Sequence, residues 1–487
     1  MIMLTFYGGV HEIGGNKILL EDDGISIFLD FGMSFGNRAR FYSEYLNPRT
    51  FNGIGDLLTM GLVPPIHGIY RQDLCGQTFY PLHPRQQGIC SAPAFPSAVI
   101  LSHAHADHAN YISLLSDKIP IYTGSISKSI LQAMHDTGQR SLEGEIIDFR
   151  EKNPGVSWQK RPIIPRNFVT FQSDKEFQIG SLKIRPFNVD HSIPDSYGFI
   201  IYTSSGPIVY TGDLRLHGIR SELTREFVRQ AHNSNPIALI CEGTNIEEEP
   251  GLSEEDVQEQ NQQIISKTDK LVFVTFGGRD IDRMFTFYQV AKGNNRKLVI
   301  TTKQAYLLEL LHQHPHHNFP IVPLDEVLIY LSRKNDGIYQ EKDYDKWERK
   351  YLSYPNVIKA DYVNQHQAEL IMSLDFFQID ELIDIQPDHG AHYIHSISEP
   401  FNEEMEIDAR SLDNWLGHFK FTKSPTNDKH LPYQIHASGH ASGQELKELI
   451  QQIKPAKLFP IHTNKPDLFE EMGVEMIKVE YGKGIFL

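Results

Sequence analysis

Four side chains that can bind metal stand within six positions of this chain. An apolar run ends in the sequence LSHAHADHAN, which contains His103, His105, Asp107 and His108. If the strand geometry of that run persists, His103 and His105 point the same way and can bind one ion, while Asp107 and His108 on the following turn reach a second. Imidazole together with carboxylate suits zinc or manganese. The alternative is a histidine-rich surface loop, but this spacing directly after an apolar strand favours a two-metal centre.

Further candidate ligands follow other apolar runs. His191 lies in NVDHSIPD, Asp213 in YTGDLR and His462 in PIHTNKP, each just after a strand-like segment. A single histidine at a strand end is usually a hydrogen-bonded core or surface residue. Taken together with the HAHADH segment, the three residues are better interpreted as ligands of the same centre.

These motifs resemble those of a known family. LDFG around Asp30, HAHADH, the histidine of DHSIPD and the aspartate of TGD resemble the four motifs of the metallo-β-lactamase fold. Glu242 in CEGT, His440 in HASGH and His462 in PIHT resemble the three additional motifs of the β-CASP nucleases. Within that group, HASGH and DHSIPD resemble the ribonuclease J family most. The match covers essentially the whole chain, with the motifs in family order.

The resemblance implies a role for each motif residue. It implies two divalent ions, zinc or manganese, with His103, His105 and His191 on the first, Asp107, His108 and His462 on the second, and Asp213 between them. Two such ions about 4 Å apart lower the pKa of a bridging water and stabilise the charge that develops during in-line attack on a phosphodiester.

The same resemblance assigns Asp107, Glu242 and His440 to catalysis. His440 is the expected acid that protonates the leaving alkoxide, and Glu242 keeps its imidazole oriented and charged. Asp30 is expected to hold a loop or a ligand in place rather than to bind metal.

Two segments are candidate substrate contacts. His436, Ser438 and Gly439 precede His440, where a tight glycine turn could present amides to a phosphate; a turn that caps the following helix is the open alternative. The run TFGGRDIDR contains Arg279 and Arg283, where the resembling nucleases contact the RNA backbone. A plain helix entry remains the alternative for this run.

The fold class expected is α/β, in three parts. Short strand-like runs between turns suit a sandwich of sheets, and from about residue 222 strands alternate with helices, which indicates a parallel sheet. The resemblance implies an αββα metallo-β-lactamase sandwich over residues 1–220, a β-CASP insertion over 221–431 and a return segment over 432–487. The spacing also predicts a helix over 125–135.

The predicted function is that of a metal-dependent ribonuclease acting on single-stranded RNA as a 5′ exonuclease, an endonuclease or both. A DNA nuclease of the same superfamily is one alternative. A small-molecule metallohydrolase is another, although a small substrate needs neither the large insertion nor the distal Glu242 and His440. An inactive RNA-binding scaffold is the third, but inactive homologues lose ligands and every ligand position here is filled.

Composition narrows the class of protein further. The chain has 487 residues, 40% of them hydrophobic, and a formal net charge of −16, which disfavours nonspecific coating of nucleic acid. Carboxylates gathered at a metal centre are offset by the ions they bind, so a nuclease stays compatible with this charge. We expect a cytoplasmic protein without a membrane partner, because no apolar run approaches about 18 residues and the start lacks a basic segment.

The oligomeric state is left open by the sequence. Residues 37–96 form a proline-rich and aromatic-rich insertion that suits either a surface excursion or a substrate lid or dimer contact. The chain ends at Leu487, soon after His462, so we expect it to lack the separate C-terminal domain of many ribonuclease J proteins. A homodimer is therefore one possibility.

Overall fold

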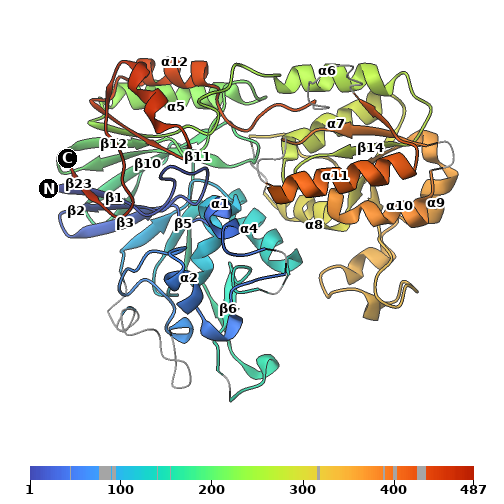
Figure 1. Ribbon diagram of the computed structural model, residues 1–487, viewed down its shortest axis with the longest axis horizontal. Coiled ribbons are helices and arrows are strands. Elements are labelled where there is room, and N and C mark those ends of the chain that lie inside the picture. Colours follow the sequence, from blue (N-terminus) through green and yellow to red (C-terminus); the bar gives the residue numbers. More distant parts are fainter. Residues whose placement is uncertain are drawn as a thin grey trace.

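The computed structural model divides into two lobes, which lie left and right in Figure 1. It describes residues 1–43, 45–75, 89, 95–139, 141–153, 155–314, 318–387, 390–398, 403–424 and 435–487. Residues 76–88 and 90–94 lie outside this range, so a lid or dimer contact within the 37–96 insertion stays a prediction.

The left lobe is built on two seven-stranded sheets. The first sheet has the strand order β23 (Gly484–Phe486), β1 (Ile2–Phe6), β2 (Ile18–Asp22), β3 (Ile25–Leu29), β4 (Ala98–Ile100), β5 (Ile121–Gly124) and β8 (Phe168–Phe171). The second has the order β22 (Glu475–Met476), β21 (Lys457–Ile461), β13 (Ala238–Glu242), β12 (Gly206–Tyr210), β11 (Ser196–Thr203), β10 (Leu182–Val189) and β9 (Phe177–Ile179). A hairpin of β6 (Asp148–Arg150) and β7 (Ile163–Pro165) projects from this lobe.

The strands carry apolar side chains on both faces, so each sheet packs on the other sheet with one face and on helices with its second face. In β2, Ile18 and Leu20 enter the core between the sheets, whereas Leu19 enters the core on the outer face. Phe6 of the first sheet stacks on Phe459 of the second at a centroid distance of 6.0 Å. The result is the expected sandwich of two sheets with helices outside.

Helices complete the outer layers of this sandwich. Helix α4 (Ser125–Thr137) covers the first sheet, while α5 (Ser221–Asn233) and α12 (Gly443–Ile453) cover the second. The helix predicted over 125–135 is confirmed by α4. The short helices of this lobe are α1 (Phe35–Ala39), α2 (Gly55–Thr59) and α3 (Ala106–Ala109).

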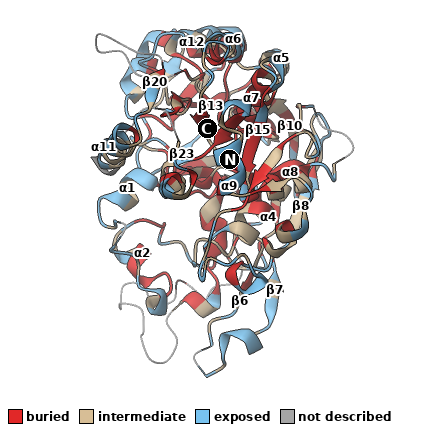
Figure 2. Ribbon diagram, turned by 90° about the vertical axis from the view of Figure 1, so that its right-hand side faces the viewer, coloured by how far each residue is buried: buried red, intermediate tan, exposed pale blue. Residues whose placement is uncertain are grey.

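The right lobe is a parallel sheet with helices on both faces. Its strand order is β17 (Val357–Ile358), β16 (Leu328–Tyr330), β15 (Lys297–Thr301), β18 (Leu370–Ser373), β14 (Val272–Thr275), β19 (His392–His395) and β20 (Thr422–Ser424). Its helices are α6 (Glu254–Ile265), α7 (Ile281–Gly293), α8 (Thr302–Leu311), α9 (Ala360–Gln365), α10 (Leu382–Ile385) and α11 (Glu403–His418). The strands of both lobes form the buried centre in Figure 2.

The lobes share a continuous apolar core. Helix α4 of the left lobe packs on α8 of the right lobe, and both contribute to one cluster of buried side chains. Tyr306 on α8 donates a hydrogen bond to Asp136 on α4 at 2.7 Å. Within the described residues, no helix is both long enough and apolar enough to cross a membrane.

The topology corrects one predicted boundary. An insertion that begins at residue 221 would take α5 and β13 into the right lobe. Instead β13 pairs in parallel with β12 and β21, and α5 packs on β10 and α12, so both belong to the left lobe. The boundary we now propose lies after Glu242, whereas residues 425–434, which span the predicted return at 432, lie outside the described residues.

One edge of the sandwich gathers the ends of several strands. Strands β3, β4 and β5 are parallel in the first sheet, as are β12, β13 and β21 in the second. Strand β10 also runs in the direction of β12, because each is antiparallel to β11. The segments that follow these strands therefore meet at the same edge.

Gly32, just after β3, tests how closely the loops pack there. A Cβ atom at this position would lie 1.6 Å from the backbone oxygen of Asp107, and neither group is a flexible side-chain end. Gly32→Ala should therefore lower the free energy of unfolding by at least about 2 kcal/mol in denaturant titrations. Gly36→Ala is the matched control, because a Cβ there meets nothing within 4 Å. Equal stability of the two variants would contradict this packing.

Candidate metal centre

Five imidazoles surround a single carboxylate oxygen at this edge. The Oδ2 atom of Asp213, which follows β12, lies 3.0 to 3.9 Å from one ring nitrogen of each of five histidines. These histidines are His108 at 3.0 Å, His462 at 3.7 Å, His103 at 3.8 Å, and His191 and His440 at 3.9 Å. Side chains from positions 103 to 462 thus converge as the strand ends predict.

The potential ligand atoms form overlapping groups, in each of which they lie within 4.8 Å of one another. The groups are His103, His105, His191 and Asp213; Asp107, His108 and His462; and Asp213, Glu242, His440 and His462. The first two are the predicted ligand sets, with Asp213 joined to the first. The third adds Glu242 and His440.

Hydrogen bonds to the outer ring nitrogens orient four of the imidazoles. Nδ1 of His108 donates to Asp30 at 2.7 Å, and Nδ1 of His191 donates to the carbonyl of Gly439. Nδ1 of His462 lies 2.7 Å from the Thr244 hydroxyl, which itself donates to Glu242 and so accepts from the imidazole. The Ser102 hydroxyl, which donates to Asp30, likewise accepts from Nδ1 of His103 at 3.0 Å. Each ring therefore turns its Nε2 toward the centre.

Asp30 is placed as expected, beside the ligands rather than among them. Its carboxylate accepts hydrogen bonds from the Ser102 amide and hydroxyl, from Tyr210 and from His108. These contacts use both oxygens, and the side chain is fully buried. Asp30 thus fixes the first residues after β4 and the ring of His108.

The protonation tendencies suit a cation at the centre. Burial, with the neighbouring imidazoles, holds the pKa of His103 and of His191 well below the usual range, and burial lowers the pKa of His105 to about 3. These rings are neutral at pH 7 and can offer lone pairs. Burial opposes a charge on His108, but Asp213, Asp107 and Asp30 raise its pKa well above the usual value. The carboxylates therefore create a site that favours positive charge.

The donor set fits a metal ion. Asp213 is fully ionised, because the positive charges of His108 and His462 outweigh burial and hold its pKa well below the usual range. Its Oδ1 atom is buried and has no hydrogen-bond partner among the described residues. A buried carboxylate oxygen without a partner is costly unless a cation satisfies it. The cluster can accordingly bind metal.

The half-buried His440 pairs with the fully buried Glu242 next to this cluster. Nδ1 of His440 lies 3.1 Å from both carboxylate oxygens of Glu242, which also accepts from the amides of Leu214 and Thr244. Burial disfavours a charge on His440, but Glu242 outweighs it and raises the pKa of His440 to about 9. An imidazolium here can act as a proton donor.

The loop before His440 approaches the ligands closely. A Cβ atom on Gly439 would lie 3.0 Å from the His191 ring and 2.8 Å from the Ser192 hydroxyl, so a larger residue would press on this ring. The Ser438 hydroxyl accepts from the His440 amide at 3.2 Å and from Asn245 at 2.7 Å. The loop thus shapes the site, while its contact with substrate stays a prediction.

The two arginines predicted to contact substrate differ in burial. Arg279, in the loop between β14 and α7, is half-buried, and its positive charge acts on Asp107 and His105 of the left lobe. Arg283 is fully buried on α7, where its guanidinium binds Glu254 and Ser396. The prediction that Arg283 contacts substrate is therefore wrong. His436 faces it at 3.2 Å.

Sequence reasoning missed the residues that orient the ligands. Thr244 bridges His462 and Glu242, and Ser102 bridges His103 and Asp30. Thr244 stands inside the motif CEGT and Ser102 directly precedes His103, so adjacency to a motif was the available signal. Tyr210, which donates to Asp30, directly precedes the TGD motif and had the same signal.

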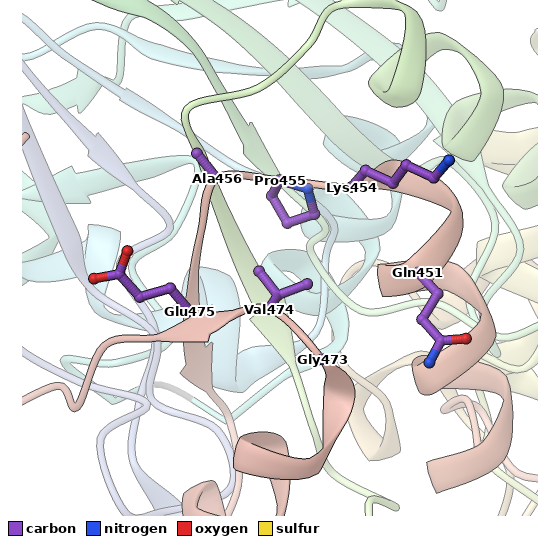
Figure 3. A pocket seen from close by; sticks show the side chains of 7 residues that line it. All are labelled: Gln451, Lys454, Pro455, Ala456, Gly473, Val474 and Glu475. Carbon is purple, nitrogen blue, oxygen red and sulfur yellow. The ribbon is translucent and has the colours of Figure 1, made fainter.

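A surface pocket lies apart from this centre. Figure 3 shows it between the C-terminal end of α12 and β22. Its volume is about 390 Å³. It is lined by Gln451, Lys454, Pro455, Ala456, Gly473, Val474 and Glu475. This lining contains none of the clustered ligands.

Comparisons with known proteins agree with the geometry. Residues 65–234 match a family described as beta-lactamase superfamily domain, and residues 432–478 match one described as Zn-dependent metallo-hydrolase RNA specificity domain. The second match includes His440 and His462. Together they show the metallo-β-lactamase fold and a similarity to zinc-dependent hydrolases.

Several ribonuclease J proteins are similar along the chain. The protein of Mycoplasma genitalium is 23% identical over 94% of this chain and 67% of its own length. That of Helicobacter pylori is 21% identical over 95% and 56%, and that of Thermus thermophilus 26% identical over 75% and 57%. The chain thus spans between about half and two thirds of the length of these relatives. The resemblance inferred from the motifs is confirmed.

A solved structure of similar fold covers the whole chain. It is a protein of unknown function from Enterococcus faecalis, 24% identical, with a TM-score of 0.72 over 100% of both chains. This likeness supports the two-lobed fold alone.

Asp213 is the residue whose removal tests the centre. Asp213→Ala deletes the carboxylate shared by the ligand groups, so zinc retained after gel filtration should fall to half of the wild-type content or less by elemental mass spectrometry. His135→Ala, which removes a histidine that pairs with Asp148 outside the cluster, should leave it unchanged. Wild-type zinc content in Asp213→Ala would exclude this carboxylate as a ligand.

Proposed function

We propose that this chain, a metallo-β-lactamase-fold relative of ribonuclease J, is a metal-dependent ribonuclease that hydrolyses phosphodiester bonds of single-stranded RNA. The observation that carries the proposal is the placement of His440 beside the ligand cluster, with its Nδ1 3.9 Å from Asp213 and 3.1 Å from Glu242. A proton donor next to a metal site suits hydrolysis of a bond whose leaving group is a poor one. The match to an RNA specificity domain supports RNA as the substrate.

Two divalent ions, zinc or manganese, are the proposed cofactors. His103, His105 and His191 would hold one, and Asp107, His108 and His462 the other, with Asp213 shared. The chemistry that such ions supply when bound is the acidification of water and the neutralisation of phosphate charge. The chain's own part is to present neutral imidazoles and ionised carboxylates in fixed orientations.

His440 is the proposed acid that protonates the leaving oxygen. Its Nδ1 is held by Glu242, so the proton on the opposite ring nitrogen, Nε2, is available for transfer. Glu242 keeps the ring charged until transfer and stabilises its orientation. The catalytic role proposed for Asp107 is that of a ligand, because its Oδ2 atom lies 3.2 Å from Nε2 of His462.

The substrate would bind beside Arg279 and the loop before His440. Arg279 faces His105 and Asp107 from the right lobe, where its charge can bind a phosphate. The loop of His436, Ser438 and Gly439 leads into His440, and its Gly439 carbonyl contacts His191. We propose these groups as contacts to the RNA backbone.

The test incubates purified zinc-loaded and manganese-loaded protein with four substrates. Three are nucleic acids labelled at either end, namely 5′-monophosphorylated RNA, 5′-triphosphorylated RNA and matched DNA, and the fourth is a chromogenic ester. Release of nucleotides or internal fragments from RNA alone is expected. Label position separates 5′ exonucleolytic from internal cleavage.

Other products would point to the alternatives. Cleavage of DNA at a rate equal to that of RNA would replace the proposal with a DNA nuclease. Rapid ester hydrolysis without cleavage of any nucleic acid would replace it with a small-molecule hydrolase.

His440→Ala tests the proposed acid. Loss of a general acid should lower kcat on RNA by a factor of about 10² to 10⁴, while zinc content stays at the wild-type value. His366→Ala, which removes a histidine paired with Glu369 near the surface, is the matched control and should keep wild-type kcat. A His440→Ala enzyme that turns over normally would remove this residue from catalysis, and one that has lost zinc would make it a ligand.

A homodimer stays a prediction. Light scattering on the eluting protein measures the mass directly, and a monomer would remove the suggested dimer contact in residues 37–96.

A further inference from the structure

A cluster of six buried charges joins the two lobes behind the candidate site. The interlobe ionic cluster consists of Asp190, Arg215 and Arg220 from the left lobe and Glu254, Asp282 and Arg283 from the right lobe. Every member is at most 8% exposed. Charges this deeply buried need partners, because their hydration is lost on folding.

The ion pairs of the cluster cross between the lobes. Arg215 binds Asp190 of its own lobe at 3.2 Å, and Glu254 and Asp282 of the other lobe at 3.1 and 3.2 Å. Arg220 binds Asp282 at 2.7 Å, and Arg283 binds Glu254 at 2.9 Å. Each right-lobe carboxylate therefore holds a left-lobe arginine. Three arginines balance three carboxylates.

The remaining guanidinium protons bind backbone carbonyls of the site. Arg283 donates to the carbonyl of Ala437 at 3.3 Å, and Arg215 donates to that of Ser438 at 3.2 Å. Arg220 donates to the carbonyl of His191 at 3.1 Å. The cluster thus holds two successive carbonyls just before Gly439 and the backbone of a proposed metal ligand.

The held loop has no regular secondary structure. Residues 435–440 belong to no helix or strand, and their backbone is tied at the two ends, by Ile435 to His395 and by Ala441 to Leu214. Between these ties His191 donates to the Gly439 carbonyl, His217 donates to the Ser438 carbonyl at 2.9 Å, and Asn245 donates to the Ser438 hydroxyl and to the His440 carbonyl. The arginines add to these contacts, and through their interlobe ion pairs they couple the loop before His440 to both lobes.

We propose that the interlobe ionic cluster is a positioning device, which places His440 for proton transfer only when the right lobe is seated on the left. This inference rests on the proposed function of His440. Its members are positioning residues, since they contact neither the ligand cluster's inner nitrogens nor the proton of His440. A displacement of about 1 Å in a reacting group can cost two orders of magnitude in rate.

Buried ion pairs alone are weak evidence of function. Replacing such a network with apolar side chains often leaves stability unchanged or improves it, so stability does not explain why charges occupy this interface. What the cluster supplies here, and apolar side chains cannot, is a set of donors for the carbonyls of the catalytic loop.

Glu254→Gln tests the device with little change in shape. It removes the negative charge that holds Arg215 and Arg283, so kcat on RNA should fall at least about 10-fold while KM changes less than about 3-fold. Zinc content should remain at the wild-type value. Amide hydrogen exchange of residues 435–442, measured without substrate, should speed up at least about 10-fold.

Arg296→Met is the matched control. Arg296 is also buried and donates to three backbone carbonyls, those of Thr268, Lys270 and Leu370, but within the right lobe and away from the loop. It should lower the melting temperature while kcat and exchange of 435–442 stay within about 2-fold of wild type. Asp282→Asn serves in place of Glu254→Gln if that variant does not fold, because Asp282 binds both Arg215 and Arg220.

The outcomes separate this inference from the proposed function. Slower turnover with faster loop exchange and full zinc content supports it. Changes in Glu254→Gln no larger than those in Arg296→Met, at equal loss of melting temperature, would overturn it. If wild-type protein cleaves no RNA, the exchange measurement still decides whether the cluster positions the loop.

Discussion

The candidate site depends on one buried carboxylate that has an oxygen without a hydrogen-bond partner among the described residues. Asp213 sits among five imidazoles, with one oxygen within 3.9 Å of a nitrogen of each and the other oxygen without a partner among the described residues. His108 and His462 offset the charge of Asp213, but a buried oxygen without a partner is costly in a low-dielectric interior. A bound metal ion would satisfy this oxygen, and it would also account for the hydrogen-bonded outer nitrogens and the converging inner ones.

The sandwich delivers these groups because its strands end together. Apolar residues on both faces lock β4, β12 and β21 into their sheets, and each strand releases its ligand at the common edge. The loops pack so tightly there that a Cβ atom at Gly32 would overlap the backbone of Asp107. The right lobe adds Arg279 and its half of the interlobe ionic cluster. It therefore contributes to the site although it supplies no ligand of the two proposed ions.

The sequence predicts those features of the site that depend on neighbouring residues along the chain. The strand before His103, the helix α4 and the convergence of His191, Asp213 and His462 followed from apolar runs and motif spacing. The predicted boundary at residue 221 was wrong because, in the sequence, α5 and β13 look like one more helix and strand of the alternating α/β series that follows them. Only pairing of β13 with β21, which lies more than 200 residues away, assigns them to the left lobe. The prediction that Arg283 contacts substrate failed for a similar reason, because Arg283 is buried against Glu254 and Ser396 of other elements.

The most direct test of the shared carboxylate is anomalous diffraction from crystals of the zinc-loaded or manganese-loaded protein. Two peaks about 3.5 to 4 Å apart, one beside His103, His105 and His191, the other beside Asp107, His108 and His462, with Asp213 touching both, are the predicted result. A centre without anomalous density at full metal loading, or one ion bound away from Asp213, would contradict it.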